Sequence, residues 1–74
     1  MPNARKPQLL DMVAVLRGGD DPNVQVGDVG TVVELLPPDG TEVEFLDRTG
    51  RTRSVATFRV DEVLVLNRQR TPVG

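Results

Sequence analysis

The sequence predicts an all-β fold: a small, mostly antiparallel barrel of five short strands. Short runs rich in Val, Leu and Thr alternate along the chain with clusters of Gly, Pro, Asn and Asp, which is typical of strands joined by turns. Two glycines, Gly27 and Gly30, open the longest of these runs, as expected where a chain turns and enters a strand that bends within a small barrel. Such a barrel is expected to leave no open sheet edge.

The first strand is predicted over residues 12–16, a short apolar run with Asp before it and two glycines soon after. Because side chains alternate along a strand, Val13 and Val15 should face inward together. Residues 18–25 then form a long polar loop of turn-forming residues. Val24 is the apolar residue of this loop, and we expect it to fold back onto the core.

The second strand is predicted over residues 29–36. It is apolar on both faces except at Thr31 and Glu34, as expected of a strand that bends so that each half buries a different face. Gly30 has no Cβ and suits a point of close approach between strands. Residues 37–40, Pro-Pro-Asp-Gly, end the strand and predict a tight hairpin.

The later strands follow in quick succession. Residues 41–46 alternate cleanly between polar and apolar, and residues 47–50 form a second tight turn. Residues 51–59 give a fourth strand, residues 58–61 a bend or one turn of helix, and residues 62–66 a fifth strand. The expected core is Val13, Val15, Val29, Val32, Val43, Phe45, Val55 and Val63. The barrel should span residues 11–66, between flexible tails at 1–10 and 67–74.

Composition restricts the chemistry. The chain has no Cys and no His, so it lacks thiolate metal ligands, disulfides and the commonest general base. Neither Ser54 nor Thr57 has a neighbouring base to activate it as a nucleophile. We expect no enzyme activity, no cofactor and no metal site. No apolar run approaches the roughly 20 residues that span a bilayer, so we expect a cytoplasmic protein.

Arginines supply the candidate partner-binding residues. Arg51 and Arg53 are expected on one face of the fourth strand with Arg48 in the adjoining turn, where forked hydrogen bonds would grip an acidic surface or a phosphate. The alternative is cross-strand pairing with Glu42 and Glu44, which contributes little. The full candidate set is Arg48, Arg51, Arg53 and Arg59.

Three other groups of residues have simple structural interpretations or suggest an interface. The loop carboxylates Asp20, Asp21 and Asp28 lack the spacing of a calcium loop, so turn formation is the favoured interpretation. Glu42 and Glu44 should be exposed, which suits solubility better than acid–base catalysis. Large apolar residues pointing away from the expected core would form an interface between copies of the chain. These residues are Met12, Leu36, Leu46 and Leu66.

A resemblance to known proteins adds to this interpretation. Residues 27–33, Gly-Asp-Val-Gly-Thr-Val-Val, preceded by the strand that begins Asp11-Met12-Val13-Ala14, resemble the opening of SH3-like barrels that include the KOW motif. The run from 11 to 66 is similar to a family of short bacterial proteins of uncharacterised function, through these segments, Glu42-Val43-Glu44-Phe45-Leu46-Asp47 and Gly50-Arg51-Thr52. The resemblance implies an SH3-like barrel.

The same resemblance implies a role in partner binding. Some members of that family are thought to lie beside toxin-like genes, so we expect a protein-interaction module, an antitoxin-type neutraliser or a small subunit of an assembly. The alternative is a KOW-like domain that binds nucleic acid or the ribosome. However, residues 19–23 carry aspartates where RNA-binding KOW loops carry basic residues, and the net charge is −2. Since phosphate contacts supply most non-specific affinity, nucleic acid is the less favoured partner.

Overall fold

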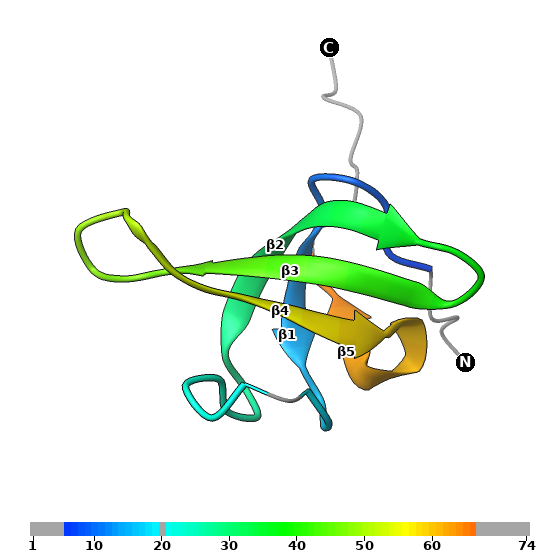
Figure 1. The fold of residues 1–74 in the computed structure, drawn as a ribbon, viewed down its shortest axis with the longest axis horizontal. Helices are drawn as coiled ribbons and strands as arrows, with labels where there is room; N and C mark the ends of the chain where they lie inside the picture. Colours follow the sequence, from blue (N-terminus) through cyan, green and yellow to red (C-terminus); the bar gives the residue numbers. More distant parts are fainter. Residues whose placement is uncertain (1–5, 20, 67–74) are drawn as a thin grey trace, which may run out of the picture.

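The computed structural model describes residues 6–19 and 21–66. Within this part, five antiparallel strands form one sheet in the order β4-β3-β2-β1-β5 (Figure 1), which confirms the predicted all-β, five-stranded barrel. The strands are β1 (Met12–Val15), β2 (Val29–Leu36), β3 (Gly40–Leu46), β4 (Thr52–Arg59) and β5 (Val63–Val65), and a 3-10 turn, η1 (Val60–Glu62), joins the last two. This turn falls where a bend or helical turn was predicted.

The sheet curves around its core side chains, and η1 joins its two outermost strands, β4 and β5. A bulge between Val32 and Glu34 bends β2, so its two halves pair with β1 on one side and β3 on the other. Among the described residues, no pairing joins β4 to β5, so both are edge strands. The expectation of a barrel without an open edge is therefore wrong, because the three residues of η1 carry the chain around the end of the sheet without a ladder.

Of the expected tails, residues 1–5 and 67–74 lie outside the described part. Residues 6–10 are described and lie against the barrel. Pro7 is buried, and the Leu10 N–H donates a hydrogen bond of 2.8 Å to the Val32 carbonyl. The chain is thus attached to β2 before β1 begins.

Gly30 lies at the close approach that the sequence predicted. A Cβ on this residue would lie 2.6 Å from Cγ1 of Val43 and 2.7 Å from the carbonyl oxygen of Glu44, both too near for any side chain. Gly27 has a different role, since its φ of 94° belongs to the turn before β2. The two glycines therefore serve the turn and the packing of β2 on β3.

The core is centred on two aromatic rings. Phe45 and Phe58 pack edge to face, with centroids 6.2 Å apart and planes at 70°. Val24 and Val65 pack against the cluster from outside, so the expected return of Val24 to the core is confirmed. The buried apolar residues are Val13, Val15, Val32, Val43, Phe45, Ala56, Phe58 and Val63.

Two predicted core residues are wrong. Val29 is 46% exposed and Val55 is 48% exposed. Val29 points outward because its neighbour Gly30 takes the inward position against β3. Val55 points outward because alternate residues of β4 face the core, and the large buried ring of Phe58 puts Ser54 and Ala56 on that inward face.

Candidate functional site

The β3–β4 hairpin extends beyond the rest of the sheet, and its tip, residues 47–51, lies at the left of Figure 1. Asp47 organises this tip. Its Oδ1 accepts hydrogen bonds from the Thr49 hydroxyl (2.7 Å), the Thr49 N–H (2.8 Å) and the Arg51 N–H (3.1 Å). Gly50 follows with a φ of 88°, a conformation that glycine adopts without strain. The tip is thus shaped by its own side chains without help from the core.

These hydrogen bonds also affect the protonation of Asp47. The Thr49 hydroxyl, followed by the Arg51 and Thr49 N–H groups, holds the pKa of the Asp47 carboxyl below its usual value. The cause is direct, because each donor bonds better to the charged carboxylate than to the neutral acid. The order of the tip therefore depends on an ionised Asp47.

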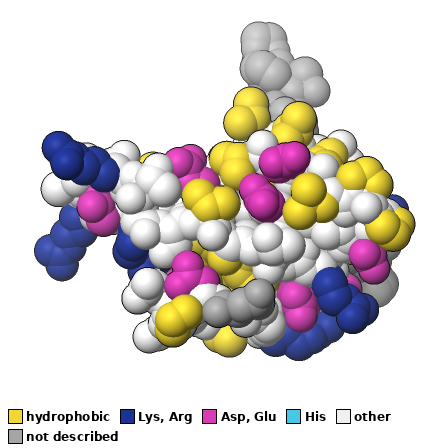
Figure 2. Space-filling view, in the orientation of Figure 1, with side chains coloured by type: hydrophobic (Ala, Val, Ile, Leu, Met, Phe, Trp, Pro, Cys, Tyr) yellow, Lys and Arg dark blue, Asp and Glu magenta, His cyan; other side chains and the backbone are white. Residues whose placement is uncertain are grey.

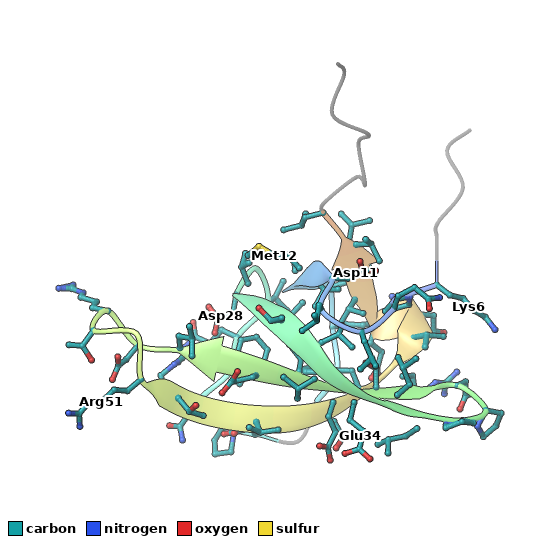
Figure 3. All side chains as sticks on the ribbon, turned by 90° about the horizontal axis from the view of Figure 1, so that it is seen from above. Lys6, Asp11, Met12, Asp28, Glu34 and Arg51 are labelled. Atoms are coloured by element: carbon teal, nitrogen blue, oxygen red, sulfur yellow. The ribbon has the colours of Figure 1, made fainter. Side chains whose placement is uncertain are left out.

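Arg48 and Arg51 project from this tip. Both are exposed, and Figure 3 shows Arg51 pointing away from the sheet. Within the described part of the chain, neither guanidinium has a salt-bridge or hydrogen-bond partner. Figure 2 shows the resulting concentration of basic side chains at this end of the molecule.

Arg53 occupies a different environment. The register between β3 and β4 shifts after Phe45, which leaves Arg53 as the extra residue of a bulge. Its guanidinium donates to the carbonyl of Asn23 (2.7 Å), approaches Oδ2 of Asp28 (3.4 Å) and lies 6.0 Å from the centroid of the Phe45 ring. Arg53 therefore connects the loop before β2 to the hairpin. The expectation that Arg51 and Arg53 share one face of the fourth strand is wrong, because Arg53 is the extra residue of the bulge.

Arg59 lies at the far end of β4. Its Nη2 is 3.4 Å from Oδ2 of Asp61 in η1, and Nη2 of Arg17 approaches the same oxygen at 3.6 Å. The four candidate arginines therefore do not form one cluster. Arg48 and Arg51 lie together at the tip, whereas Arg53 and Arg59 are engaged by aspartates elsewhere.

The alternative pairing of these arginines with Glu42 and Glu44 is also wrong. Among the described residues, every salt bridge of a candidate arginine is to an aspartate. Glu44 instead accepts a hydrogen bond from the Thr52 hydroxyl, and Glu42 lies directly opposite Glu34 on β2. Because the bulge turns Arg53 away, the outer face of β2 and β3 keeps its negative charge.

The loop carboxylates have structural partners. Oδ1 of Asp21 accepts the N–H of Asn23 (2.8 Å), and Oδ2 of Asp28 accepts the N–H of Gln25 (2.9 Å). These are turn-forming contacts. Asp20 lies outside the described residues, and within the described ranges no group of three acidic side chains is arranged to hold a metal ion.

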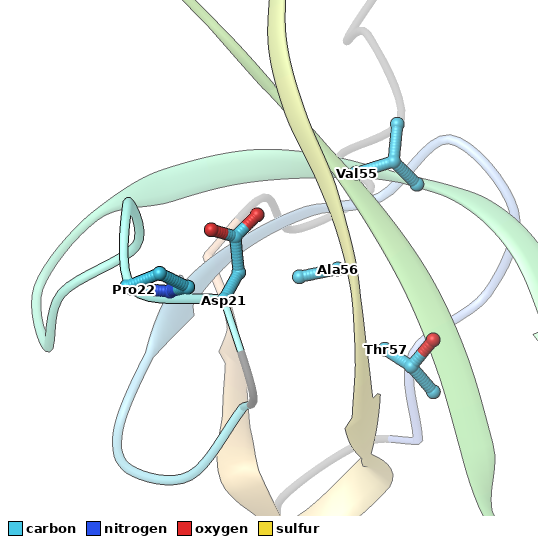
Figure 4. Close-up of a pocket in the computed structure, with 5 residues that line it drawn as sticks. All are labelled: Asp21, Pro22, Val55, Ala56 and Thr57. Atoms are coloured by element: carbon cyan, nitrogen blue, oxygen red, sulfur yellow. The ribbon is translucent and has the colours of Figure 1, made fainter.

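A shallow hollow lies beside β4, and no local sequence pattern indicates it. It has a volume of about 350 Å³ and is formed between the loop residues Asp21 and Pro22 and the strand residues Val55, Ala56 and Thr57 (Figure 4). Residues separated by more than thirty positions meet here because Arg53 draws the loop toward the hairpin. The hollow runs along the outer edge of the sheet.

The apolar residues proposed for an interface between copies are mostly exposed. Met12 is 44% exposed, Leu46 50% and Leu66 45%, whereas Leu36 is half-buried. Met12 and Leu66 are neighbours, since the Leu66 N–H donates to the Met12 carbonyl at 2.8 Å. These two side chains thus begin a small apolar area on the outer face of β1 and β5.

In the part of the chain that the structure describes, no helix reaches the length and apolarity of a membrane span. No curated protein and no solved structure matches the sequence. Residues 9–65 match the model of one family, described as a domain of unknown function, DUF4926. This match includes all five strands, the arginine-bearing tip and the hollow beside β4. The chain belongs to the DUF4926 family.

Proposed function

We propose that this chain is a non-catalytic protein-interaction module that grips an acidic surface of its partner with the β3–β4 tip. The observation that carries this proposal is that the guanidinium groups of Arg48 and Arg51 have no partner among the described residues, on a turn that hydrogen bonds to Asp47 keep ordered. A binding loop that is already ordered loses less entropy on association. Arginine is also enriched at the energetic centres of protein interfaces.

The proposed setting is the bacterial cytoplasm, with the chain acting as an antitoxin-type neutraliser of a neighbouring protein or as a small subunit of an assembly. The resemblance to short bacterial SH3-like proteins supports this setting. The exposed apolar side chains of Met12 and Leu66 would also allow two copies of the chain to associate, and such association is compatible with partner binding through the tip. Light scattering on the pure protein measures it directly.

The alternative is a KOW-like domain that binds nucleic acid with the same arginines. Two observations weigh against it. Phe45 and Phe58, the aromatic residues of the chain, are buried and offer no stacking surface for bases. Glu34 and Glu42 also place negative charge on the outer face of the sheet, where phosphate is repelled.

A capture experiment tests the proposal. The protein is immobilised and exposed to lysate of its own source, and recovered proteins are quantified by mass spectrometry. We expect the double variant R48Q/R51Q to lose most of the recovered partner. The control K6Q/R17Q removes the same charge at exposed positions outside the tip and outside β4, and it should retain the partner. Equal recovery by both variants would show that the tip is not the binding surface.

A mobility-shift assay at low salt distinguishes the nucleic-acid-binding alternative from the protein-interaction module. Nucleic-acid binding depends on released counterions, so the affinity of a KOW-like domain would be greatest at low salt and would fall steeply as salt rises. We expect no retardation of single-stranded RNA or duplex DNA. If the parent protein retards the nucleic acid and the R48Q/R51Q variant does not, the partner of the tip is a nucleic acid and the protein-interaction proposal is wrong.

A further inference from the structure

The outer edge of β4 exposes backbone groups that no other described strand uses. Backbone N–H and C=O groups of successive strand residues point alternately to the two sides of the strand. On β2, Val32 donates to the Asp11 carbonyl (2.9 Å) and accepts from the Leu10 N–H (2.8 Å), so its backbone groups point toward the β1 side. Those of the opposite residue on β3, Val43, therefore point away from β2 and toward β4.

The alternation continues onto β4. Val43 is paired with Ala56, so the backbone groups of Ala56 point toward β3 and those of Val55 and Thr57 point out of the sheet. None of the backbone hydrogen bonds among the described residues joins Val55 or Thr57 to the neighbouring loop. The hollow of about 350 Å³ lies along these two residues, with room beside the strand.

Arg59 shows that an outward N–H group of β4 can bind a carboxylate. It is the next residue of the same alternating set, and its N–H donates to Oε1 of Glu62 at 2.9 Å. A carboxylate thus already occupies the outward N–H at one end of the strand. At the other end, the guanidinium of Arg51 has no partner among the described residues. The edge therefore combines free backbone groups and an adjacent hollow with the basic tip at one end, whereas Arg59 at the other end is engaged by Asp61.

We propose that the β4 edge binds an extended acidic segment of the partner, which adds to the sheet as a sixth strand. This inference rests on the proposed function and defines the chemistry of the partner. The distance from Arg51 to Arg59 corresponds to about 26 Å of strand, so the segment should be about nine residues long. Asp21 lines the hollow together with residues 55–57, the middle of β4, so the centre of the segment should be neutral and its acidic residues should lie at the end beside Arg51.

Main-chain hydrogen bonds give the affinity in this mode of recognition, and side chains give the specificity. The test therefore uses a fluorescent peptide of about nine residues with alternating Val and Thr between Glu at both ends, so that a Glu lies beside Arg51 in either strand orientation. Two derivatives are N-methylated on alternate sets of N–H groups, so that only one of them blocks the groups facing β4. A third peptide carries Lys in place of Glu.

We expect the acidic peptide to bind and to shift the NMR amide signals of Val55 and Thr57. One methylated derivative should bind about tenfold or more weakly, as the loss of its hydrogen bonds requires, and the other should retain affinity. The Lys peptide should not compete. The full protein without substitutions is used throughout, so a folding defect cannot produce the result.

Several results would overturn the inference. These are no binding of the acidic peptide, equal affinity of both methylated derivatives, or equal binding of the Lys peptide. Signal changes confined to residues 47–51 would limit binding to the tip, which rejects the added strand but leaves the proposed function intact. Conversely, shifts at Val55 and Thr57 that single-stranded RNA causes and the acidic peptide does not would assign the edge to nucleic acid.

Discussion

The base and the tip of the β3–β4 hairpin are built from the same two strands but are held by different forces. At the base, Thr41 lies opposite Phe58 and Val43 opposite Ala56, and all four are buried. At the tip, residues 47–51 are all exposed and are shaped by hydrogen bonds to one carboxylate. The base therefore supplies stability, and the tip is available for binding.

This difference separates residues that the fold needs from residues that a partner uses. A substitution at the base should unfold the barrel and tell little about function. A substitution of a tip arginine should leave the fold intact. The contrast yields four predictions, from the largest expected effect on stability to the smallest.

The largest effect is expected at the base. Phe58→Ala removes one ring of the aromatic pair and should lower the free energy of unfolding by about 3–5 kcal/mol, measured by urea denaturation. The control in the same strand is Val55→Ala, which should cost no more than about 0.5 kcal/mol because Val55 is exposed. A larger loss at Val55 than at Phe58 would mean that β4 presents its other face to the core.

A smaller loss is expected where β2 approaches the base. Gly30→Ala places a methyl group against Val43 and the Glu44 carbonyl, which should cost about 1–3 kcal/mol in the free energy of unfolding. The neighbouring Val29→Ala should change stability by only about 0.5 kcal/mol. If Gly30→Ala is as stable as the parent protein, β2 and β3 are not in the close contact described.

A local effect is expected at Asp47. Asp47→Ala should speed amide exchange at Thr49 and Arg51 and leave exchange at Ala56 and Phe58 unchanged, because its hydrogen bonds lie within the tip. Acid should also lower the protection of the Thr49 amide, measured as the ratio of its intrinsic exchange rate to its observed exchange rate at each pH. The pKa of Asp47 is lowered in the folded state, so its contribution is present above the unfolded-state pKa and is lost as pH falls through the folded value. If neither Asp47→Ala nor acid changes the protection of the Thr49 amide, this role of Asp47 is wrong.

The smallest effect on stability is expected for Arg48 and Arg51. Neither guanidinium has a partner among the described residues, so R48Q/R51Q should unfold within about 0.5 kcal/mol of the parent protein. Thermal and urea denaturation measure this difference. A loss of more than about 1 kcal/mol would give these arginines a structural role and weaken the case for binding.

Much of the fold follows from the sequence. The five strands, the close approach at Gly30 and the packing of Val24 follow from local patterns of Gly, Pro and apolar residues. The inward face of β4 does not, because residues 51–59 alternate weakly and Val55 is the residue expected inward. In the structure the buried ring of Phe58 sets the alternation, which puts Ser54 and Ala56 inward and Val55 outward.

The candidate site was less predictable than the fold. The positions of the tip arginines follow from the turn at residues 47–50, which the sequence shows directly. The contacts of Arg53 depend on a bulge and on Asp28, a residue 25 positions away, and no local pattern reports such a contact. The free edge of β4 depends on how the sheet closes, which is a property of the whole barrel.

Amide hydrogen exchange along β4 of the unbound protein tests the central claim most directly, because that claim is a hairpin anchored by its base with its outer edge open. The structure predicts slow exchange at Ala56 and Phe58, whose N–H groups point toward β3, and fast exchange at Val55 and Thr57, whose N–H groups point outward. Uniformly slow exchange from 55 to 58 would contradict the claim, because another segment would then cover the edge.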